Sequence, residues 1–389
     1  MQNTKKYIET GLRWFGRNDS LGLENLKQAG ADFIVSALHE VAVGDVWEVA
    51  QIKAYQAQMA KHKLLWKVVE SLPVHEAIKH QGPGFENYIE NYKQSMINLA
   101  QCGIKTITYN FMPVLDWVRT NHHFQNEDGT HTLQFDPVAM AYFDCYILKR
   151  EGAKDSYKAN LLAQLEHFHE AHSETEKKQL KDYVLLGLPG SSEDFSLSDL
   201  KKLMAPYHSL TKKDLRQNLI DFLEEIIPVA QAHKLQMAIH PDDPPFSVLG
   251  LPRIVSTADD LAALFEAVPA PENGLCFCSG SLGADPNNDL NLILNTHKER
   301  VHFLHLRDVH CLPDGSFQEA NHLSGDHNMR TLVQTTLALA QERNITLPLR
   351  PDHGFLHAFE SHKKYYPGYS LLGRMQGLSA LKGLIYGLS

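Results

Sequence analysis

The chain has 389 residues, of which 43% are hydrophobic and 21% are charged, a balance that excludes an intrinsically disordered protein. Its 46 acidic and 37 basic residues give a net charge of −9, which disfavours binding to nucleic acid or to an anionic membrane. The five cysteines form no even, disulfide-like set, and the N-terminus lacks the apolar core of a signal peptide. We therefore expect a cytoplasmic enzyme, and its 22 histidines point to metal or acid–base chemistry.

Short apolar runs alternate with amphipathic stretches along the chain. Gly30 and Gly103 each end a helical pattern and are followed at once by an apolar run. The predicted strands are Arg13–Gly16, Asp32–Leu38, Leu64–Ser71, Ile104–Phe111, Leu235–His240, Gly274–Ser279, Val301–Arg307 and Ile345–Asp352. Eight strands that alternate with helices predict an α/β fold, a closed (β/α)8 TIM barrel. The alternative is a doubly wound open sheet, but no glycine-rich nucleotide-binding pattern supports it.

The connection between the fourth and fifth predicted strands is unusually long, roughly 120 residues, far more than a βα unit needs. Its first part, Asp116–Asp136, is polar and rich in turn residues, and capping-box patterns at Ser173 and Ser196 predict short helices. We therefore predict one catalytic barrel domain over residues 1–389, with a largely helical rim insertion at about 116–205.

Potential metal ligands lie at the ends of the last four predicted strands: His240, Cys278, His305 and Asp352. The carboxyl ends of parallel barrel strands meet on one face, where barrel enzymes place their active sites. Any one of these residues could be a packing or hydrogen-bonding residue, but four in succession would converge on one point. Two imidazoles, a thiolate and a carboxylate suit Zn, Fe, Co or Mn better than Mg.

Other residues near these strand ends are suited to acid–base and substrate contacts. His353 follows Asp352 directly, and Tyr369 lies in a turn-rich loop that should follow the last strand. Arg307 lies two residues after His305, so it should share its face and could bind a carboxylate with two hydrogen bonds.

The same residues carry a resemblance to a known family. The chain resembles mannonate dehydratase, which converts D-mannonate to 2-keto-3-deoxy-D-gluconate in hexuronate breakdown. The motifs are Arg13–Gly16, Val69–Pro73, Tyr109–Trp117, Ala238–Pro245, Gly250–Ser256, His305–Arg307, Arg350–Gly354 and Pro367–Ser370. The resemblance implies a barrel of the xylose-isomerase type that uses Mn²⁺ or Fe²⁺. It also places the metal ligands on the four residues named above, and catalytic positions on His353 and Tyr369.

Dehydration of a sugar acid requires a base for the C2 proton and an acid for the C3 hydroxyl that leaves. We predict that His353 and Tyr369 share these roles, with either assignment open. We further predict that Arg307, Asn110 and His39 hold the substrate's carboxylate and hydroxyls. A tyrosine base would need a lowered pKa, which the metal or a cation such as Arg307 could provide.

Three other functions are consistent with such a barrel. A metal-dependent sugar isomerase or epimerase would use similar contacts, and product analysis separates it from a dehydratase. The acidic charge disfavours a metal-dependent endonuclease, and the adjacent polar residues disfavour a purely structural metal site. The partner is expected to be a small sugar acid, with no nucleic acid and no membrane, and a homodimer is left open.

Overall fold

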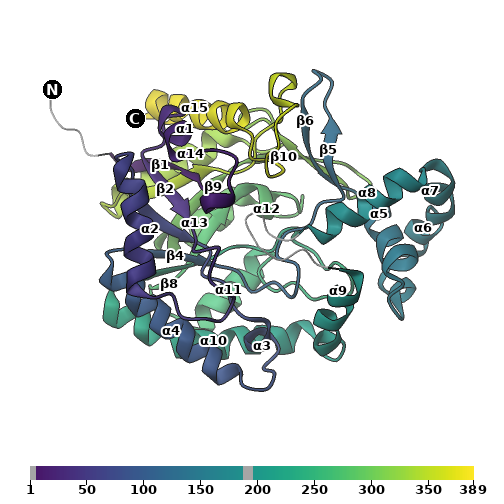
Figure 1. The fold of residues 1–389 in the computed structure, drawn as a ribbon, viewed down its shortest axis with the longest axis horizontal. Coiled ribbons are helices and arrows are strands. Elements are labelled where there is room, and N and C mark those ends of the chain that lie inside the picture. The colour runs from purple at the N-terminus through teal and green to yellow at the C-terminus, as the bar shows by residue number, and fades with distance from the viewer. Residues whose placement is uncertain (1–5, 187–195) are drawn as a thin grey trace.

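In the computed structural model, which describes residues 6–186 and 196–389, eight parallel strands close into a barrel (Figure 1). Around the barrel the strands follow the order β1-β12-β9-β8-β7-β4-β3-β2. Their bounds are β1 (Ile8–Arg13), β2 (Phe33–Ser36), β3 (Trp66–Glu70), β4 (Thr106–Tyr109), β7 (Gln236–Ile239), β8 (Asn273–Cys278), β9 (Val301–Leu306) and β12 (Leu347–Pro351). The predicted (β/α)8 barrel is confirmed, and the open sheet is excluded.

The first strand lies earlier than predicted, at Ile8–Arg13 rather than at Arg13–Gly16. Glu9, Thr10 and Gly11 obscure the apolar pattern of this strand, and Gly11 leaves room for the Phe33 ring, which a Cβ atom would meet at 2.4 Å. Trp14 and Phe15, which were predicted to lie in this strand, come after its end, and Trp14 stacks on Tyr55 of α2.

Helices surround the barrel and join its strands (Figure 1). Gly30 and Gly103, both with positive φ, follow α1 and α4 as their sequence positions predict. The connecting helices are α1 (Leu23–Gln28), α2 (Val49–Lys61), α3 (Glu76–Lys79), α4 (Phe85–Gln101), α10 (Lys212–His233), α11 (Ala258–Ala267), α12 (Ser279–Gly283), α13 (Leu290–Thr296), α14 (Met329–Glu342) and α15 (Leu371–Leu388). Among the described residues, no helix combines the length and apolarity that a bilayer crossing demands.

The interior of the barrel is filled by apolar side chains below the strand ends. One cluster within it comprises Phe33, Val35, Val68, Ala238, Cys276 and Phe303. Cys276 thus packs as a small hydrophobic residue, whereas Cys278, on the same face of β8, lies one step nearer the carboxyl end. The filled interior leaves the carboxyl-terminal rim as the place for chemistry.

The insertion after β4 contains a hairpin as well as helices. Its strands β5 (Asn121–Gln125) and β6 (His131–Phe135) join β10 (Asp308–Cys311) and β11 (Phe317–Ala320) in an antiparallel sheet of order β10-β11-β6-β5. We call this four-stranded unit the rim sheet. The prediction of a largely helical insertion is therefore correct only in part. The polar sequence of the hairpin resembles that of a loop, and the strand β6 is stabilised by pairing with the distant strand β11.

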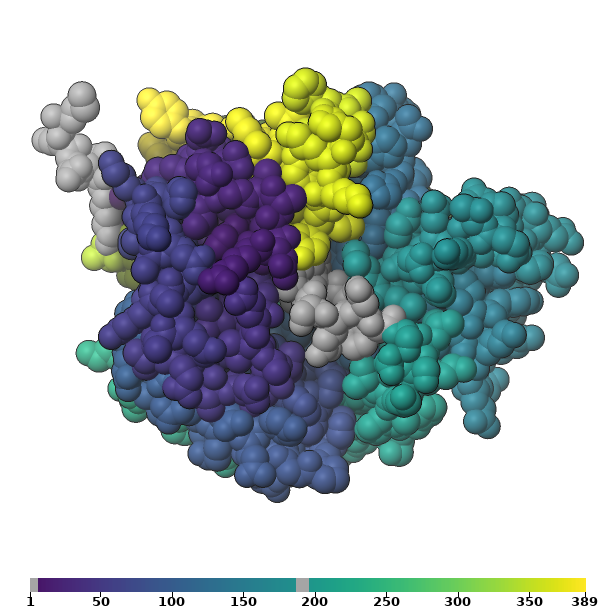
Figure 2. Space-filling model, viewed as in Figure 1, coloured from purple at the N-terminus to yellow at the C-terminus, as the bar shows by residue number. Residues whose placement is uncertain are grey.

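The helices of the insertion project to one side of the barrel (Figures 1 and 2). They are α5 (Pro137–Tyr142), α6 (Ala159–Leu162), α7 (Leu165–Ala171), α8 (Glu174–Leu185) and α9 (Leu197–Met204). Ser173 and Ser196 form the predicted capping boxes at the starts of α8 and α9. The remaining short helical turns are Gly16–Asn18, Phe143–Leu148, Ala153–Ser156, Ala205–Tyr207, Lys298–Arg300 and Ala358–Glu360.

Candidate active site

Three of the four predicted ligands form one cluster at the carboxyl ends of β7, β8 and β9. One donor atom each from His240, Cys278 and His305 lies within 4.8 Å of the other two. Asp352 follows β12 and lies at the edge of this cluster, with its Oδ2 atom 3.9 Å from the Cys278 sulfur. The structure therefore forms a candidate metal site from His240, Cys278 and His305, with Asp352 beside it.

Hydrogen bonds fix the orientation of both imidazole rings. Nδ1 of His240 lies 2.7 Å from the Pro241 carbonyl oxygen, and Nε2 of His305 lies 3.1 Å from the Glu70 carboxylate. These oxygens only accept hydrogen bonds, so we assign a proton to His240 Nδ1. Arg350 Nε also lies 3.1 Å from His305 Nε2, but its single N–H is nearer to the Glu70 carboxylate, at 2.9 Å, so we assign a proton to His305 Nε2 as well.

The other nitrogen of each ring then carries a lone pair, and these two nitrogens face each other. His240 Nε2 and His305 Nδ1 are 3.2 Å apart beside Cys278, where His305 is buried and His240 is half-buried. Burial lowers the pKa of His240, which favours the neutral imidazole that a metal binds. Two lone pairs and a sulfur directed at one point suit a cation, so the residues present fit a borderline divalent metal.

A network of buried charges supports the cluster from below. Glu70 accepts hydrogen bonds from Arg13 at 2.7 Å and from Arg350 at 2.6 and 2.9 Å, in addition to the bond from His305. Burial opposes ionisation of Glu70, but Arg350, His305 and Arg13 hold its pKa well below the ordinary value. The carboxylate therefore stays ionised and keeps His305 in one tautomer.

Asp352 is held in the ionised form by neighbouring cations. Its Oδ1 atom accepts hydrogen bonds from Arg350 at 2.6 Å and from the Tyr369 hydroxyl at 3.2 Å. Burial raises its pKa, but the nearby Arg350, His353 and Arg307 outweigh burial and hold the pKa well below the ordinary value. Asp352 is thus available as an anionic ligand.

His353 lies between a cation and an anion on the other side of the site. Its Nδ1 atom is 2.6 Å from Arg307 Nη1 and 3.1 Å from Glu319 Oε1. Because Arg307 only donates and Glu319 only accepts, this nitrogen can be stabilised with or without a proton. The opposite nitrogen, Nε2, is correspondingly able to give or to take a proton.

Arg307 is bound to the protein at both terminal nitrogens. In addition to His353, it contacts Asp243 at 2.5 Å and Glu319 at 3.1 Å. Its Nε atom lies against Gly280, where a Cβ atom would come within 2.0 Å. If Arg307 formed a bidentate hydrogen bond with a substrate carboxylate, these contacts would have to break. The geometry therefore favours Arg307 as a residue that orients His353.

Tyr369 meets His353 edge to face, with ring centroids 5.3 Å apart. Burial raises the pKa of Tyr369 to about 12, although the nearby Arg350 and Arg13 oppose the shift. Arg350 and Arg13 are therefore the cations that favour the phenolate, and Arg374 lies over the ring at 5.6 Å, whereas the expected Arg307 contacts His353. In the protein alone Tyr369 is a hydrogen-bond donor.

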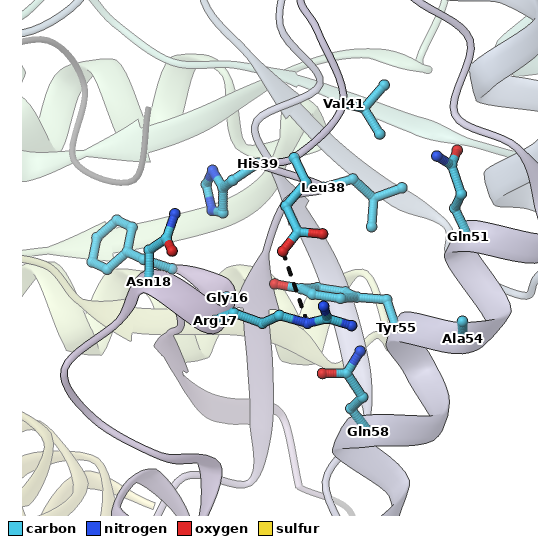
Figure 3. A pocket seen from close by; sticks show the side chains of 12 residues that line it. Gly16, Arg17, Asn18, Leu38, His39, Val41, Gln51, Ala54, Tyr55 and Gln58 are labelled. Carbon is cyan, nitrogen blue, oxygen red and sulfur yellow. Dashed lines mark ion pairs between the residues drawn. The ribbon is translucent and has the colours of Figure 1, made fainter. Parts of the chain in front are cut away.

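The structure places His39 and Asn110 in different surroundings. Asn110 follows β4 beside His240, since Tyr109 pairs with Ile239, and it donates a hydrogen bond to Asp116 at 2.9 Å. His39 lines a cavity of about 190 Å³ after β2 (Figure 3). Its buried Nε2 atom has no hydrogen-bond partner among the described residues.

Several charged residues that hold the site escaped the sequence reasoning. They are Arg13, Glu70, Arg119, Asp243, Glu319 and Arg350, and all of them are buried. Glu70 and Arg13 end strands β3 and β1, so the rule that selected the ligands could have selected them too. Glu319 does not lie at the end of a barrel strand, because it belongs to β11 of the rim sheet, so the same rule could not have selected it.

Comparison with known proteins agrees with this geometry. A family model described as D-mannonate dehydratase (UxuA) matches residues 8–389. A mannonate dehydratase of Saccharophagus degradans is 44% identical over 383 residues, 97% of this chain and 96% of the relative.

Solved structures show the same fold. The mannonate dehydratase of Streptococcus suis serotype 2 superposes with a TM-score of 0.78 at 29% identity, covering 99% of this chain and 94% of that one. A xylose isomerase-like TIM barrel protein of Mycobacterium smegmatis, at 12% identity and a TM-score of 0.56, covers 99% of this chain and 100% of its own and shares the fold. The chain therefore belongs to the D-mannonate dehydratase family, the hydro-lyases of EC 4.2.1.8, as its sequence motifs predicted.

Proposed function

We propose that the chain dehydrates D-mannonate to 2-keto-3-deoxy-D-gluconate with Mn²⁺ or Fe²⁺ held by His240, Cys278, His305 and Asp352. The observation that carries this proposal is the pair of facing imidazole nitrogens, 3.2 Å apart beside a thiol. Without a cation their lone pairs would repel, and with one they become ligands. The ionised Asp352 supplies a fourth donor at the edge of the cluster.

The reaction removes a proton from C2 of the sugar acid and hydroxide from C3. The C2 proton is weakly acidic, because the charge that develops adjoins a carboxylate that is already negative. When bound, the divalent ion supplies the positive charge that stabilises this negative charge. The chain's own residues must then orient the substrate and move two protons.

We propose that His353 and Tyr369 move these protons, one as the base at C2 and the other as the acid at the C3 hydroxyl. The two side chains lie against each other, which would let both reach neighbouring carbons of one substrate. His353 Nδ1 lies between Arg307 and Glu319, an arrangement that supports either protonation state of Nε2. Tyr369 donates to Asp352, so its role as a base would require the metal to lower its pKa.

Substrate contacts are proposed for Asn110, His39 and Arg307. Asn110 is half-buried beside His240, and His39 presents a buried nitrogen without a partner among the described residues. Both suit the hydroxyl groups of a sugar acid. Arg307 would reach the substrate only by releasing Asp243 or Glu319, so its main proposed role is to hold His353.

Metal add-back tests this function directly. Metal-free protein is incubated with D-mannonate, Mn²⁺, Fe²⁺, Zn²⁺ or Mg²⁺ is added separately, and the 2-keto-3-deoxy acid is assayed. We expect product with Mn²⁺ or Fe²⁺. An isomerised or epimerised sugar in place of the keto-deoxy acid would favour the isomerase alternative, and absence of any product with all four metals would refute the proposal.

A further inference from the structure

A second cavity, of about 360 Å³, is lined by residues of the β5–β6 hairpin and of the chain that follows β12. The two segments are joined by backbone hydrogen bonds between His131 and Leu356 at 2.8 and 2.9 Å. The charged or imidazole side chains that line this cavity are His122, His123, His131, Lys363 and Lys364. We call it the histidine pocket. Its lining includes none of the proposed metal ligands and no carboxylate.

The two lysines are exposed and have no counterion among the described residues, whereas burial lowers the pKa of His122 to about 3 and also lowers the pKa of His123, which favours their neutral forms. The ammonium groups of Lys363 and Lys364 and the rings of His123 and His131 make no hydrogen bond or ion pair with any described residue. His122 is only 5% exposed, and its Nε2 atom also lacks a hydrogen-bond partner. A concentration of basic groups without a carboxylate is unexpected in a chain of net charge −9. A buried polar nitrogen without a partner is costly unless a ligand or water bonds to it.

We propose that the histidine pocket binds a small hydroxylated carboxylate, namely a sugar acid of the substrate's class, outside the catalytic centre. The identity of the anion rests on the proposed function. The two lysines supply positive charge for the carboxylate, and the imidazole nitrogens can donate to or accept from hydroxyl groups. The volume lies within the range of small-molecule sites, about 300–1,000 Å³.

The pocket contacts the loop and the aromatic residues that hold the catalytic pair. Gly368 and Ser370 line it on either side of Tyr369 in the chain. His122 packs on Trp117 with ring centroids 5.4 Å apart, and Trp117 packs on His353 at 5.8 Å. An occupant would therefore lie one residue layer from the proposed acid and base, where it could be held before it enters the site.

Calorimetric titration with D-mannonate at low ionic strength tests this inference. The protein is the metal-loaded Tyr369→Phe enzyme, chosen so that the probe is not consumed. We expect two binding sites in this background. The additional pair Lys363→Gln and Lys364→Gln should weaken one of them at least tenfold. The matched pair Lys201→Gln and Lys202→Gln, exposed on α9 outside the pocket, should leave both sites unchanged.

Inorganic phosphate is titrated in a second arm to separate sugar acids from other small anions. Loss of one D-mannonate site on substitution of Lys363 and Lys364 supports the inference. A single site in every variant, or a lysine-dependent site that takes phosphate and not D-mannonate, overturns it. Turnover of D-mannonate by the parent enzyme with Mn²⁺ is assayed in parallel. Absence of turnover would refute the proposed function, but the two titrations would still show whether the histidine pocket binds D-mannonate.

Discussion

Replacement of Glu70 by Gln should weaken both metal binding and the fold. Glu70 is 3% exposed and, among the residues that the structure describes, is the one carboxylate that contacts His305, Arg13 and Arg350 together. Glutamine keeps the shape but loses the charge, so it offers His305 at most a neutral amide oxygen in place of the charged acceptor that fixes its tautomer. Loss of such a supporting carboxylate typically weakens metal binding about 10- to 100-fold, or about 1.4–2.7 kcal/mol.

The fold should be destabilised by a separate and larger amount. In Glu70→Gln, Arg13 stays buried at 3% exposure without its carboxylate, whereas Arg350 keeps Asp352 as a partner. Breaking a buried pair by removing one partner costs about 3–5 kcal/mol. We expect the variant to lose about 3 kcal/mol of unfolding free energy, because one of the two arginines retains a partner.

The assay is metal titration by calorimetry, combined with urea unfolding of the metal-free protein. Glu9→Gln provides the control, since Glu9 pairs with Lys67 where both side chains are about one-third exposed. That substitution should cost less than about 1 kcal/mol and leave the metal affinity unchanged. Equal metal affinity in Glu70→Gln and the parent protein would refute the view that Glu70 prepares His305 for the metal.

Three further outcomes are expected. His353→Asn and Tyr369→Phe should each lower kcat by about 10²–10⁴-fold with metal content unchanged, and near-normal turnover in either would reject its role. Glu319→Gln should lower kcat at least about tenfold with a smaller change in KM, since it replaces the charged acceptor beside His353 by a neutral amide. Although burial opposes its ionisation, hydrogen bonds from Lys6 and Thr10 lower the pKa of Asp32 to about 2 from 3.8. Asp32 therefore stabilises the fold above about pH 4 and loses this effect as the pH falls towards 2. Asp32→Asn should cost about 1 kcal/mol at pH 7, after allowance for its partial exposure, and this cost should fall as the pH is lowered and vanish only below about pH 2, as measured by urea unfolding.

The ligand cluster could be predicted from sequence because its signal is local. A strand's carboxyl end can be located from its own apolar run. Each of His240, Cys278 and His305 alone could be a packing or hydrogen-bonding residue, but their occurrence at successive strand ends indicates a metal site. Because all the strands of the barrel are parallel, their carboxyl ends lie on one face, and no knowledge of individual long-range contacts is needed to predict that these residues meet. The same reasoning located seven of the eight strands, and it failed at Ile8–Arg13, where polar residues interrupt the pattern.

The pairing of the supporting charges could not be predicted, because the partners are distant in the chain. Glu70 and Arg350 are separated by 280 positions, and Arg119 and Glu319 by 200. Whether such charges meet depends on register around the barrel and on the pairing of Phe317 with Phe135 in the rim sheet. Neither the barrel register nor this strand pairing can be predicted from the hydrophobic periodicity of a single segment.

The rim sheet makes the insertion part of the active site. Arg119, at the start of the hairpin, is fully buried and contacts both Asp243 and Glu319. With Arg307 it forms a balanced group of two cations and two anions around His353. Without Arg119, two buried carboxylates would share one guanidinium, and their repulsion would favour protonation of one or the entry of water. Glu319 would then be a weaker hydrogen-bond acceptor for His353, so the proposed catalytic residue that follows β12 depends on a segment that precedes it by more than two hundred positions.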